Sequence, residues 1–450
     1  MLPDNVLLAI FDINAVEMYG EKGDVEAWQT LVHVCRRWRC LVFGSSSRLN
    51  LRLVCTPKTP ARECLDVWPA LPLVIEGIIS STPADNIIVA LGHSDRVCQI
   101  ELKITGVTQW DEILAAMQVP FPALTDLELR CDNQPEPVIP NSFLGGSVPP
   151  RLEYLQVDYT PFPEIPNLLL TCTHLTELHL CWLSDSAYIS PEAMATCLSM
   201  LTSLRNLFLT FRSSGSRSDR EGQRTPPMTP FILPELVLIR FEVASEYLED
   251  LIARIDAPRL GYLHIHFHEE IDFHAPLAHL VQFISRTPKF QELNLVSVNL
   301  DPYAEFAFMG GGRARVGFSC DKTDDPDPQV SYVAQICTMC LPPLLTVENF
   351  KFDVYEVYPK LDWINDVENG QWLELLRPFT AVKNLYLSEE FQSKIASALQ
   401  ELVGGRTMEV LPSLQNIFFQ RSEPPQIFQE TIGRFVAARQ LSGHPVAISV

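Results

Sequence analysis

The sequence predicts an α/β fold in which short strands alternate with helices, because one strand motif returns along most of the chain. The motif is an apolar residue, two variable residues, a second apolar residue, one variable residue and a third apolar residue. Its clearest copy runs through Leu152, Leu155 and Val157. The second and third apolar positions are two residues apart, so they lie on one face of a strand. Equivalent residues occur at Leu124, Leu127 and Leu129, at Leu175, Leu178 and Leu180, at Leu204, Leu207 and Leu209, at Leu260, Leu263 and Ile265, and at Phe290, Leu293 and Leu295.

The spacing of these copies indicates how they assemble. Their middle apolar residues are roughly 23 to 30 residues apart, and the interval from 207 to 263 has room for one more copy. A unit of this length holds one strand and one helix, and only stacked units can bury the apolar edge. The sequence therefore predicts an irregular leucine-rich-repeat solenoid over residues 46–450, with a parallel sheet on its concave side and helices on its convex side.

Less regular copies extend the predicted array toward both ends. They are Leu49, Leu51 and Leu53, then Ala70, Leu73 and Ile75, then Val97, Ile100 and Leu102, and later Arg315, Val316 and Phe318, then Val347, Phe350 and Phe352, then Val382, Leu385 and Leu387, and finally Leu414, Ile417 and Phe419. None carries a consistent Asn three residues after its last apolar position, so we expect repeats of variable length.

Helical periodicity fills the intervals between the strand motifs. Residues 110–117 form one predicted helix, and Leu277 to Ile284 form another. Ser190 and Ser245 are predicted N-caps, the first followed by Pro191 in the first turn. The segment from Phe428 to Gln440 is predicted to be a C-terminal capping helix.

The first 45 residues differ from the repeats. Val6, Leu7, Ile10 and Phe11 fall at helical spacing and predict a short amphipathic helix. A polar stretch from Asn14 to Asp24 separates it from a second predicted helix, which has apolar residues at Trp28, Leu31, Val32, Cys35, Trp38 and Val42. Two short helices cannot form a stable domain alone, so this segment must pack on the solenoid or on a partner.

This segment resembles an F-box. The residues that carry the resemblance are Leu2-Pro3, Leu7-Leu8, Ile10-Phe11 and the segment 31–39, which reads Leu-Val-His-Val-Cys-Arg-Arg-Trp-Arg. With the repeats, the chain resembles an expanded group of fungal F-box and leucine-rich-repeat proteins. Such F-box proteins are substrate receptors of cullin-RING (SCF-type) ubiquitin ligases. The stretch from Asn14 to Asp24 is longer than a typical F-box loop.

The resemblance implies a division of labour. Residues 1–45 would bind the ligase adaptor, and the concave face of the solenoid would bind a target protein. The implied adaptor contacts are Leu2, Pro3, Leu7, Leu8, Ile10, Phe11, Leu31, Val34, Cys35 and Trp38. The alternative is a non-catalytic scaffold or sensor in which residues 1–45 only cap the solenoid, since terminal repeats need caps.

Outward positions of the strand motifs nominate the target-binding residues. They are Glu128, Gln156, His179, Phe208, His264, His266 and Asn294. Alternation also places His268 beside His264 and His266, on the face opposite Leu263. This histidine strand has three readings: solvated residues, a partner contact, or two ligands of a metal-dependent hydrolase completed by a carboxylate. We expect no metal or cofactor, because no helical His-Glu-x-x-His motif is present.

Charge and cysteine content narrow the partners and the compartment. The net charge of -21 argues against nonspecific binding to nucleic acid or anionic membrane and favours a basic or neutral protein partner. The N-terminus lacks the pattern of a signal peptide, and no apolar run reaches the roughly 18 residues of a membrane span. Twelve scattered cysteines are typical of reduced thiols, so a cytoplasmic or nuclear protein is expected.

The remaining motifs do not predict catalysis. Residues 212–230 are rich in Ser, Pro and Arg and predict a flexible insertion, in which Thr225 and Thr229 are possible phosphate acceptors. Gly310 to Arg313 lacks the Lys of a phosphate-binding loop and predicts a turn. Cys337 and Cys340 form a single Cys-x-x-Cys pair within apolar sequence, which is weak support for zinc. Without a catalytic motif, the chain is expected to be at most a non-catalytic ligase subunit.

Overall fold

A computed structural model of the chain describes residues 2–18, 27–80, 84–105, 107–131, 138–146, 149–183, 188–211, 230–267, 277–299, 304–320, 330, 334, 347–353, 367–402, 406–419 and 426–449. The chain divides into two compact units. Unit 1 comprises residues 1–189 and 196–204, and unit 2 comprises residues 190–195 and 205–450. Helix α8 (Pro191–Met200) crosses the boundary between them.

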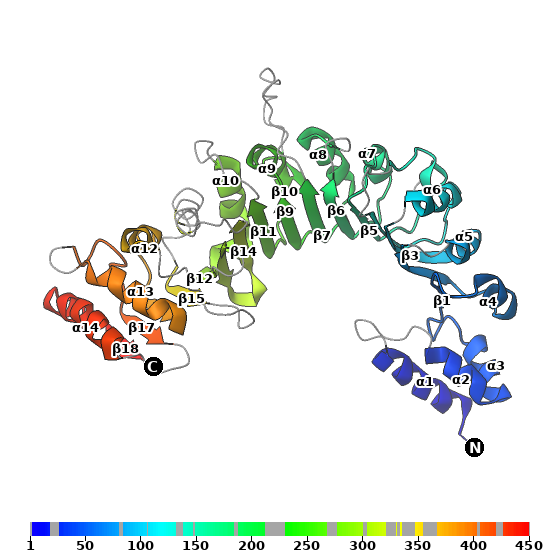
Figure 1. Cartoon of the computed structure of the whole chain (residues 1–450), viewed down its shortest axis with the longest axis horizontal. Coiled ribbons are helices and arrows are strands. Elements are labelled where there is room, and N and C mark those ends of the chain that lie inside the picture. The colour runs from blue at the N-terminus through cyan, green and yellow to red at the C-terminus, as the bar shows by residue number, and fades with distance from the viewer. Residues whose placement is uncertain are drawn as a thin grey trace. The chain divides into compact units, whose positions relative to one another are not determined.

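Unit 1 begins with three helices and continues as alternating strands and helices (Figure 1). The helices are α1 (Asp4–Met18), α2 (Ala27–Val34) and α3 (Arg36–Gly44), followed by α4 (Ala61–Val67), α5 (Asp85–Leu91), α6 (Val107–Ala116), the 3-10 turn η1 (Phe143–Gly146) and α7 (Ile165–Leu169). The strands are β1 (Leu53–Cys55), β2 (Leu73–Ile79), β3 (Val97–Ile104), β4 (Asp126–Cys131), β5 (Tyr154–Asp158) and β6 (Glu177–Leu183). Each strand pairs in parallel with the next along the chain.

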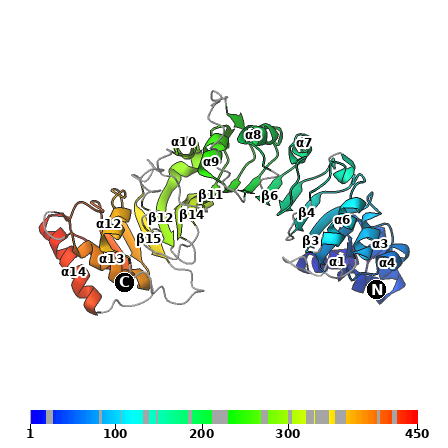
Figure 2. The same ribbon diagram turned by 45° about the horizontal axis from the view of Figure 1, so that its top comes forward.

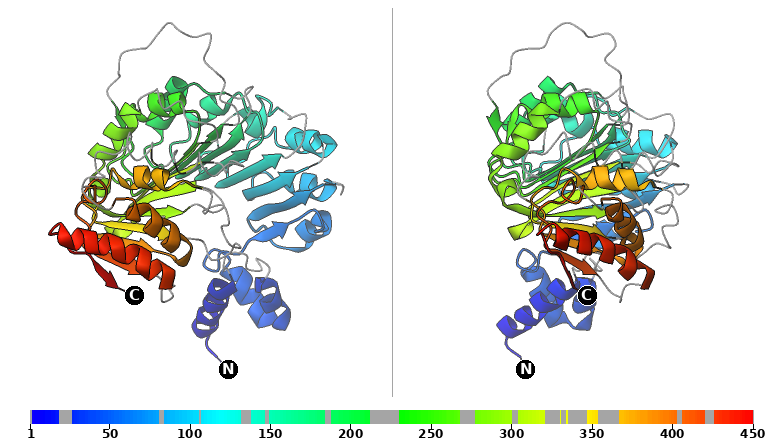
Figure 3. Two further views of the ribbon diagram at one scale, coloured as in Figure 1. Left: turned by 60° about the vertical axis from the view of Figure 1, so that its left-hand side comes forward. Right: turned by 90° about the vertical axis from the view of Figure 1, so that its left-hand side faces the viewer.

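The strand motif accounts for this stacking. The register aligns Ile75, Ile100, Leu127, Leu155 and Leu178 in one row across the sheet. All five side chains are fully buried. Helices α4 to α7 lie along one face of these strands, as the views in Figure 1 and Figure 3 show. The variable residues of the motif alternate with the buried ones along each strand, so they lie on the other face. We call this second face the open face. The predicted α/β leucine-rich-repeat fold is confirmed.

Unit 2 continues the same architecture, with helices on one face of its sheet (Figure 2). Its sheet contains, in spatial order, β7 (Asn206–Phe211), β9 (Leu238–Glu242), β11 (Tyr262–Phe267), β14 (Arg315–Cys320), β13 (Ala304–Gly310), β12 (Leu293–Asn299), β15 (Asn349–Asp353), β16 (Asn384–Leu387), β17 (Asn416–Phe419) and β18 (Ala447–Ser449). Its helices include α9 (Ser245–Ile252), α10 (Ala278–Arg286), α12 (Asn369–Leu376), α13 (Glu389–Gln400) and α14 (Gln426–Leu441), with the 3-10 turns η3 (Pro288–Glu292) and η4 (Gly311–Arg313). A separate pair of short strands joins β8 (Phe231–Ile232) to β10 (Ile255–Asp256).

Strand β9 is the additional copy expected between positions 207 and 263. Its inward residues Ile239 and Phe241 are buried and align with Leu207 and Leu209. The parallel order is then interrupted, because β13 pairs antiparallel with both β12 and β14. The sequence predicted β14 but missed β13, which has no triple apolar motif. The predicted glycine turn joins β13 to β14, and Gly312 has a φ of 67° there.

Several local predictions were wrong. The predicted helix from Trp28 to Val42 is broken at Cys35, whose extended backbone (φ −161°, ψ 167°) makes it the N-cap of α3. Helix α1 continues through Met18, so the polar stretch after Asn14 begins as helix. The residues beyond it up to 26 lie outside the described residues. Ser245 is the first residue of α9 rather than its cap.

The register of β12 also differs from the prediction. A β-bulge between Leu293 and Leu295 adds one residue to the strand. Leu295 therefore lies partly exposed in the open-face row of Asn349, and Val296 takes the buried position beside Phe350. A shift by one residue reverses the faces of all later side chains in a strand.

The predicted C-terminal helix is α14, and it is held by a buried arginine. Arg439 is fully buried and donates hydrogen bonds to the backbone oxygens of Thr407, Leu411, Pro412 and Leu414, at 3.0 to 3.4 Å. These carbonyl groups belong to the turn that precedes β17. The helix is thereby fixed to the last leucine-rich repeat.

None of the helices in the described ranges is long and apolar enough to cross a membrane. No disulfide bond joins the cysteines of the described residues. Cys337, Cys340, Thr225 and Thr229 lie outside the described residues.

Candidate protein-binding surfaces

The three N-terminal helices share a small apolar core. Leu7 and Phe11 of α1, Val32 of α2 and Val42 of α3 are buried. The ring of Phe11 meets that of Trp38 edge to face, with centroids 4.8 Å apart. These contacts fix the helices to one another.

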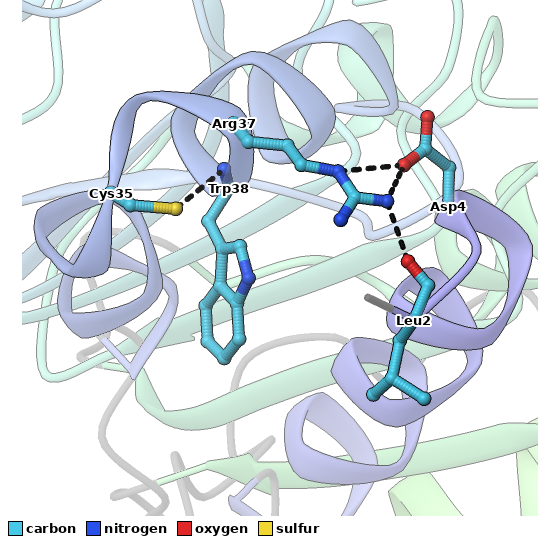
Figure 4. Close-up of polar contacts among 5 residues, drawn as sticks. All are labelled: Leu2, Asp4, Cys35, Arg37 and Trp38. Carbon is cyan, nitrogen blue, oxygen red and sulfur yellow. Dashed lines mark hydrogen bonds and ion pairs between the residues drawn. The ribbon is translucent and has the colours of Figure 1, made fainter.

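Polar contacts fasten the start of α1 to α3 (Figure 4). The guanidinium of Arg37 donates to Asp4 Oδ1, with 3.0 Å from Nε, and also to the carbonyl oxygen of Leu2. The Sγ atom of Cys35 accepts a hydrogen bond from the backbone N–H of Trp38 at 3.5 Å. Within the segment 35–38, which resembles part of an F-box, Cys35 therefore caps the start of α3, and Arg37 holds the start of α1 against α3.

A second set of apolar side chains near α1 is exposed. Leu2 is 51% exposed, Val6 38%, Ile10 38% and Ile13 60%. Their spacing of three and four residues places the last three on one side of a helix. Val34, at the end of α2, is 59% exposed. We call these five residues the exposed apolar stripe. Exposed apolar side chains that recur on one side of a helix, as those of Val6, Ile10 and Ile13 do, mark interaction sites more often than isolated ones do.

The predicted adaptor residues divide between this stripe and the core. Leu2, Pro3, Ile10, Val34 and Cys35 are exposed, whereas Leu8, Leu31 and Trp38 are partly exposed. Leu7 and Phe11 are buried and support the helices. Val6 and Ile13 were not nominated, although their spacing from Ile10 was a usable signal.

The helices also pack against the first repeat. The indole N–H of Trp28 donates to the carbonyl oxygen of Arg52 at 2.9 Å. Its ring contacts Phe43 and Trp68, with centroids 5.9 and 5.3 Å away. The aromatic group formed by Trp28, Phe43 and Trp68 connects the helices to the repeats, so the expected packing on the solenoid is observed.

On the open face of unit 1, three nominated residues share one row. The register aligns Glu101, Glu128, Gln156 and His179 on successive strands. Burial raises the pKa of Glu128 to about 7, and the nearby carboxylates of Glu101 and Asp158 add to the shift. The pKa of His179 is lowered by burial. The row therefore presents partly desolvated carboxylate, amide and imidazole groups.

The open face of unit 2 contains the other nominated residues. Phe208, Arg240 and His264 lie in one row on β7, β9 and β11. Asn294 is exposed at the bulge of β12, outside this row, and its carbonyl oxygen accepts from Asn349 Nδ2 at 3.1 Å. Its side chain is thus set apart from Phe208 and His264.

The histidine strand is not solvated. His264 and His266 are each 8% exposed, and both contact the hydroxyl of Ser319, at 2.9 Å from His264 Nε2 and 2.8 Å from His266 Nδ1. Among the described residues, no group of three metal-ligating side chains is placed to hold a metal ion. His268 and the acidic residues after it lie outside the described residues.

A further row of polar residues, which was not predicted from the sequence, lies near the C-terminal end. Asn349, Asn384 and Asn416 form a ladder, in which Asn384 Nδ2 donates to Asn349 Oδ1 at 2.9 Å and Asn416 Nδ2 donates to Asn384 Oδ1 at 2.8 Å. Beside it the rings of Tyr386 and Phe418 stack with centroids 4.8 Å apart. The signal was present, since each Asn stands directly before the middle apolar residue of its motif.

Comparisons with known proteins return only structural similarity. No protein-family model and no curated protein sequence matches the chain. A leucine-rich-repeat protein of Leptospira interrogans is similar at 12% identity and a TM-score of 0.30, over 89% of each chain. The leucine-rich-repeat-containing protein LegL7 from Legionella pneumophila is similar at 13% identity and a TM-score of 0.28, over 88% of this chain and 99% of its own.

The fold assignment rests on the strand register itself. A stacked repeat sheet with one open face presents a broad contact surface, which is characteristic of protein-binding scaffolds.

Proposed function

We propose that this chain is the substrate receptor of a cullin-RING ubiquitin ligase, acting in the cytoplasm or nucleus. Helices α1 to α3 bind the ligase adaptor, and the open faces of the repeat sheet bind a target protein. The observation that carries the proposal is the exposed apolar stripe of Leu2, Val6, Ile10, Ile13 and Val34, which lies on the segment that resembles an F-box.

The stripe is large enough to contribute to a stable contact. Its five side chains expose roughly 400 Å² in total, about half of what one partner buries in a standard interface. At about 25 cal/mol per Å² its burial supplies on the order of 10 kcal/mol before the costs of association. The polar rim is provided by Arg37 and Asp4, whose ion pair lies beside Leu2.

In the transfer of ubiquitin, the receptor contributes proximity. Binding the adaptor through α1 and the target through the sheet raises the effective concentration of target lysines beside the transfer machinery. The net charge of -21 disfavours acidic targets, so the open faces are suited to neutral or basic protein surfaces.

The test is co-purification with the cullin-binding adaptor. The variants Ile10→Asp and Ile13→Asp place a charge in the stripe without altering the buried core. Val67→Asp, on α4, is the matched control, because Val67 is 75% exposed and lies outside the stripe. Retention by the intact protein and by Val67→Asp, with loss in both stripe variants, supports the proposal. Absence of the adaptor from folded intact protein refutes it.

The second candidate is a scaffold or sensor whose N-terminal helices only seal the first repeat. The aromatic group of Trp28, Phe43 and Trp68 favours it, because its rings contact one another and Trp28 also donates to the carbonyl oxygen of Arg52, just before β1. If residues 1–45 are only a cap, Trp28→Ala lowers the unfolding free energy by about 3 to 5 kcal/mol. In that case the intact protein does not retain the adaptor, and Ile10→Asp and Ile13→Asp behave like the intact protein in the co-purification.

A further inference from the structure

The antiparallel strand β13 in unit 2 brings together a cluster of polar side chains that no sequence motif predicted. In the sheet, β14 lies between β11 and β13, so Ser319 has His266 beside it on one strand and Glu305 on the other. His264 Nε2 lies 2.9 Å from Ser319 Oγ, and His264 Nδ1 lies 3.9 Å from Glu305 Oε1. Glu305 and Ser319 lie 41 and 55 residues after His264 in the sequence, and the strand order β11-β14-β13 brings the three together.

Strand β14 leaves room for the imidazole ring. Its open-face position between Arg315 and Ser319 is Gly317, which aligns with His264. A Cβ at Gly317 would approach His264 Nδ1 to 2.9 Å, closer than real Cβ contacts allow, and would lie 3.7 Å from Glu305 Oε1. The absence of a side chain at Gly317 therefore lets the ring of His264 lie between the hydroxyl and the carboxylate.

Neighbouring groups fix the carboxylate and the ring. Arg315 forms an ion pair with Glu305 and lies over the ring of Tyr262, 5.9 Å from its centroid. The ring of Tyr262 in turn stacks against His264, with centroids 6.4 Å apart and planes 24° apart. The cluster is thus held on three strands by contacts outside the reacting atoms.

The proton positions follow from the surroundings. The hydroxyl of Ser319 has one hydrogen, so one of its two histidine neighbours accepts it and the other donates an N–H to Oγ. If His264 donated from Nε2, its bare Nδ1 would face the Glu305 carboxylate. The favoured tautomer has the proton on His264 Nδ1, directed toward Glu305, and Nε2 accepts from Ser319. His266 Nδ1–H then donates to Oγ.

We propose that Ser319 is a base-activated nucleophile that cleaves neutral carboxylic esters. Oγ attacks the ester carbonyl carbon while its proton passes to His264 Nε2, and the Glu305 carboxylate stabilises the imidazolium. The tetrahedral intermediate expels the alcohol, which takes the proton from Nε2, and an acyl-serine remains. Water then attacks the acyl carbon with His264 as base, releases the carboxylic acid and returns the proton to Ser319.

The base is available at neutral pH. Burial lowers the pKa of His264 to about 4, the Glu305 carboxylate opposes this shift, and the cations Arg240 and Arg315 together with His266 favour it. His264 is therefore neutral in the resting protein. Ser319 is 7% exposed and His264 is 8% exposed, so the polar atoms are largely shielded from bulk water.

The experiment uses the intact chain, a fluorophosphonate probe and p-nitrophenyl acetate. Oγ displaces fluoride from the probe, and peptide mass spectrometry identifies the labelled residue. We expect labelling at Ser319 that disappears in Ser319→Ala and falls at least tenfold in His264→Gln. Ser297→Ala, at an open-face position of β12, is the control that retains it. The rate of p-nitrophenolate release should follow the labelling: it is retained by the intact protein and Ser297→Ala, reduced in His264→Gln and lost in Ser319→Ala.

Two outcomes overturn the proposal. One is intact, folded protein that is not labelled at Ser319. The other is labelling at Ser319 that His264→Gln leaves unchanged, since the hydroxyl would then react without its base. Thermal unfolding of each variant verifies that the fold persists. Removing the buried hydroxyl of Ser319 also removes its contacts with His264 and His266, so the unfolding temperature of Ser319→Ala is expected to fall. Loss of labelling counts for the proposal only in a variant that is still folded at the assay temperature.

Discussion

Replacing Glu128 by Gln is expected to stabilise the protein at alkaline pH. Glu128 lies on β4 in the same open-face row as Glu101 of β3, one strand away. Adjacent strands are about 4.8 Å apart, so two ionised carboxylates in one row repel each other. Burial is the largest cause of the raised pKa of Glu128, and Arg130 compensates only in part. Glutamine keeps the shape and removes the charge.

The sign and size follow from the pKa. In the folded protein the pKa of Glu128 is about 7, compared with an ordinary value of 4.5. The folded state therefore holds the proton more tightly, and the unfolding free energy falls as pH rises from 4.5 to 7. The full shift corresponds to about 3 kcal/mol, which partial exposure reduces to about 1 to 2 kcal/mol. Glu128→Gln should therefore raise the unfolding free energy by about 1 to 2 kcal/mol at pH 8 and change it little at pH 4.5.

The assay is urea-induced unfolding at pH 4.5, 6 and 8. Glu112→Gln, an exposed position of α6, is the control and should change stability by less than about 0.5 kcal/mol at every pH. Glu101→Gln should stabilise at pH 8 by less than Glu128→Gln, because it removes only one cause of the shift. An equal effect of Glu128→Gln at pH 4.5 and pH 8, or destabilisation at pH 8, would refute the reasoning.

Three further changes test the contacts that organise unit 2. Arg439→Met should lower the unfolding free energy by about 3 to 5 kcal/mol, because it leaves four carbonyl groups without their buried donor; Arg434→Met, exposed on the same helix, should have little effect in the same urea titration. Gly317→Ala should cost about 1 to 3 kcal/mol by displacing the His264 ring, whereas Gly311→Ala, with open space around it, should be nearly neutral by calorimetry. Glu249→Ala should cost about 1 to 2 kcal/mol, because both carboxylate oxygens accept N–H groups at the start of α10, from His279 and Leu280; loss of hydrogen-exchange protection in that turn is the measurement, and unchanged protection would contradict it.

The repeat architecture was predictable because its information is local and recurrent. The alternation of Leu127 and Leu129 defines the faces of one strand, and repetition of that pattern fixes the register of its neighbours. The same offset nominated Glu128, Gln156 and His179 as outward residues, and the strand register aligns them in one row. It also nominated His264 for the open face.

The tertiary structure decided the features that leave no periodic pattern. Cys35 breaks a segment that its apolar spacing predicted to be one helix. The bulge between Leu293 and Leu295 moves the following residues of β12 to the face opposite the predicted one. The spacing of Ile10 and Ile13 is visible in the sequence, but the exposure of their side of α1 and the burial of Leu7 depend on how three helices pack.

The cluster around Ser319 shows the difference most clearly. His264 could be placed on a face from the sequence alone, because a strand has a period of two residues. Its neighbours Glu305 and Ser319 come from strands 41 and 55 residues further along the chain, one of which runs antiparallel to the other. Their contact depends on the order of strands in the sheet, and that order is set by long-range hydrogen bonding and burial rather than by local spacing.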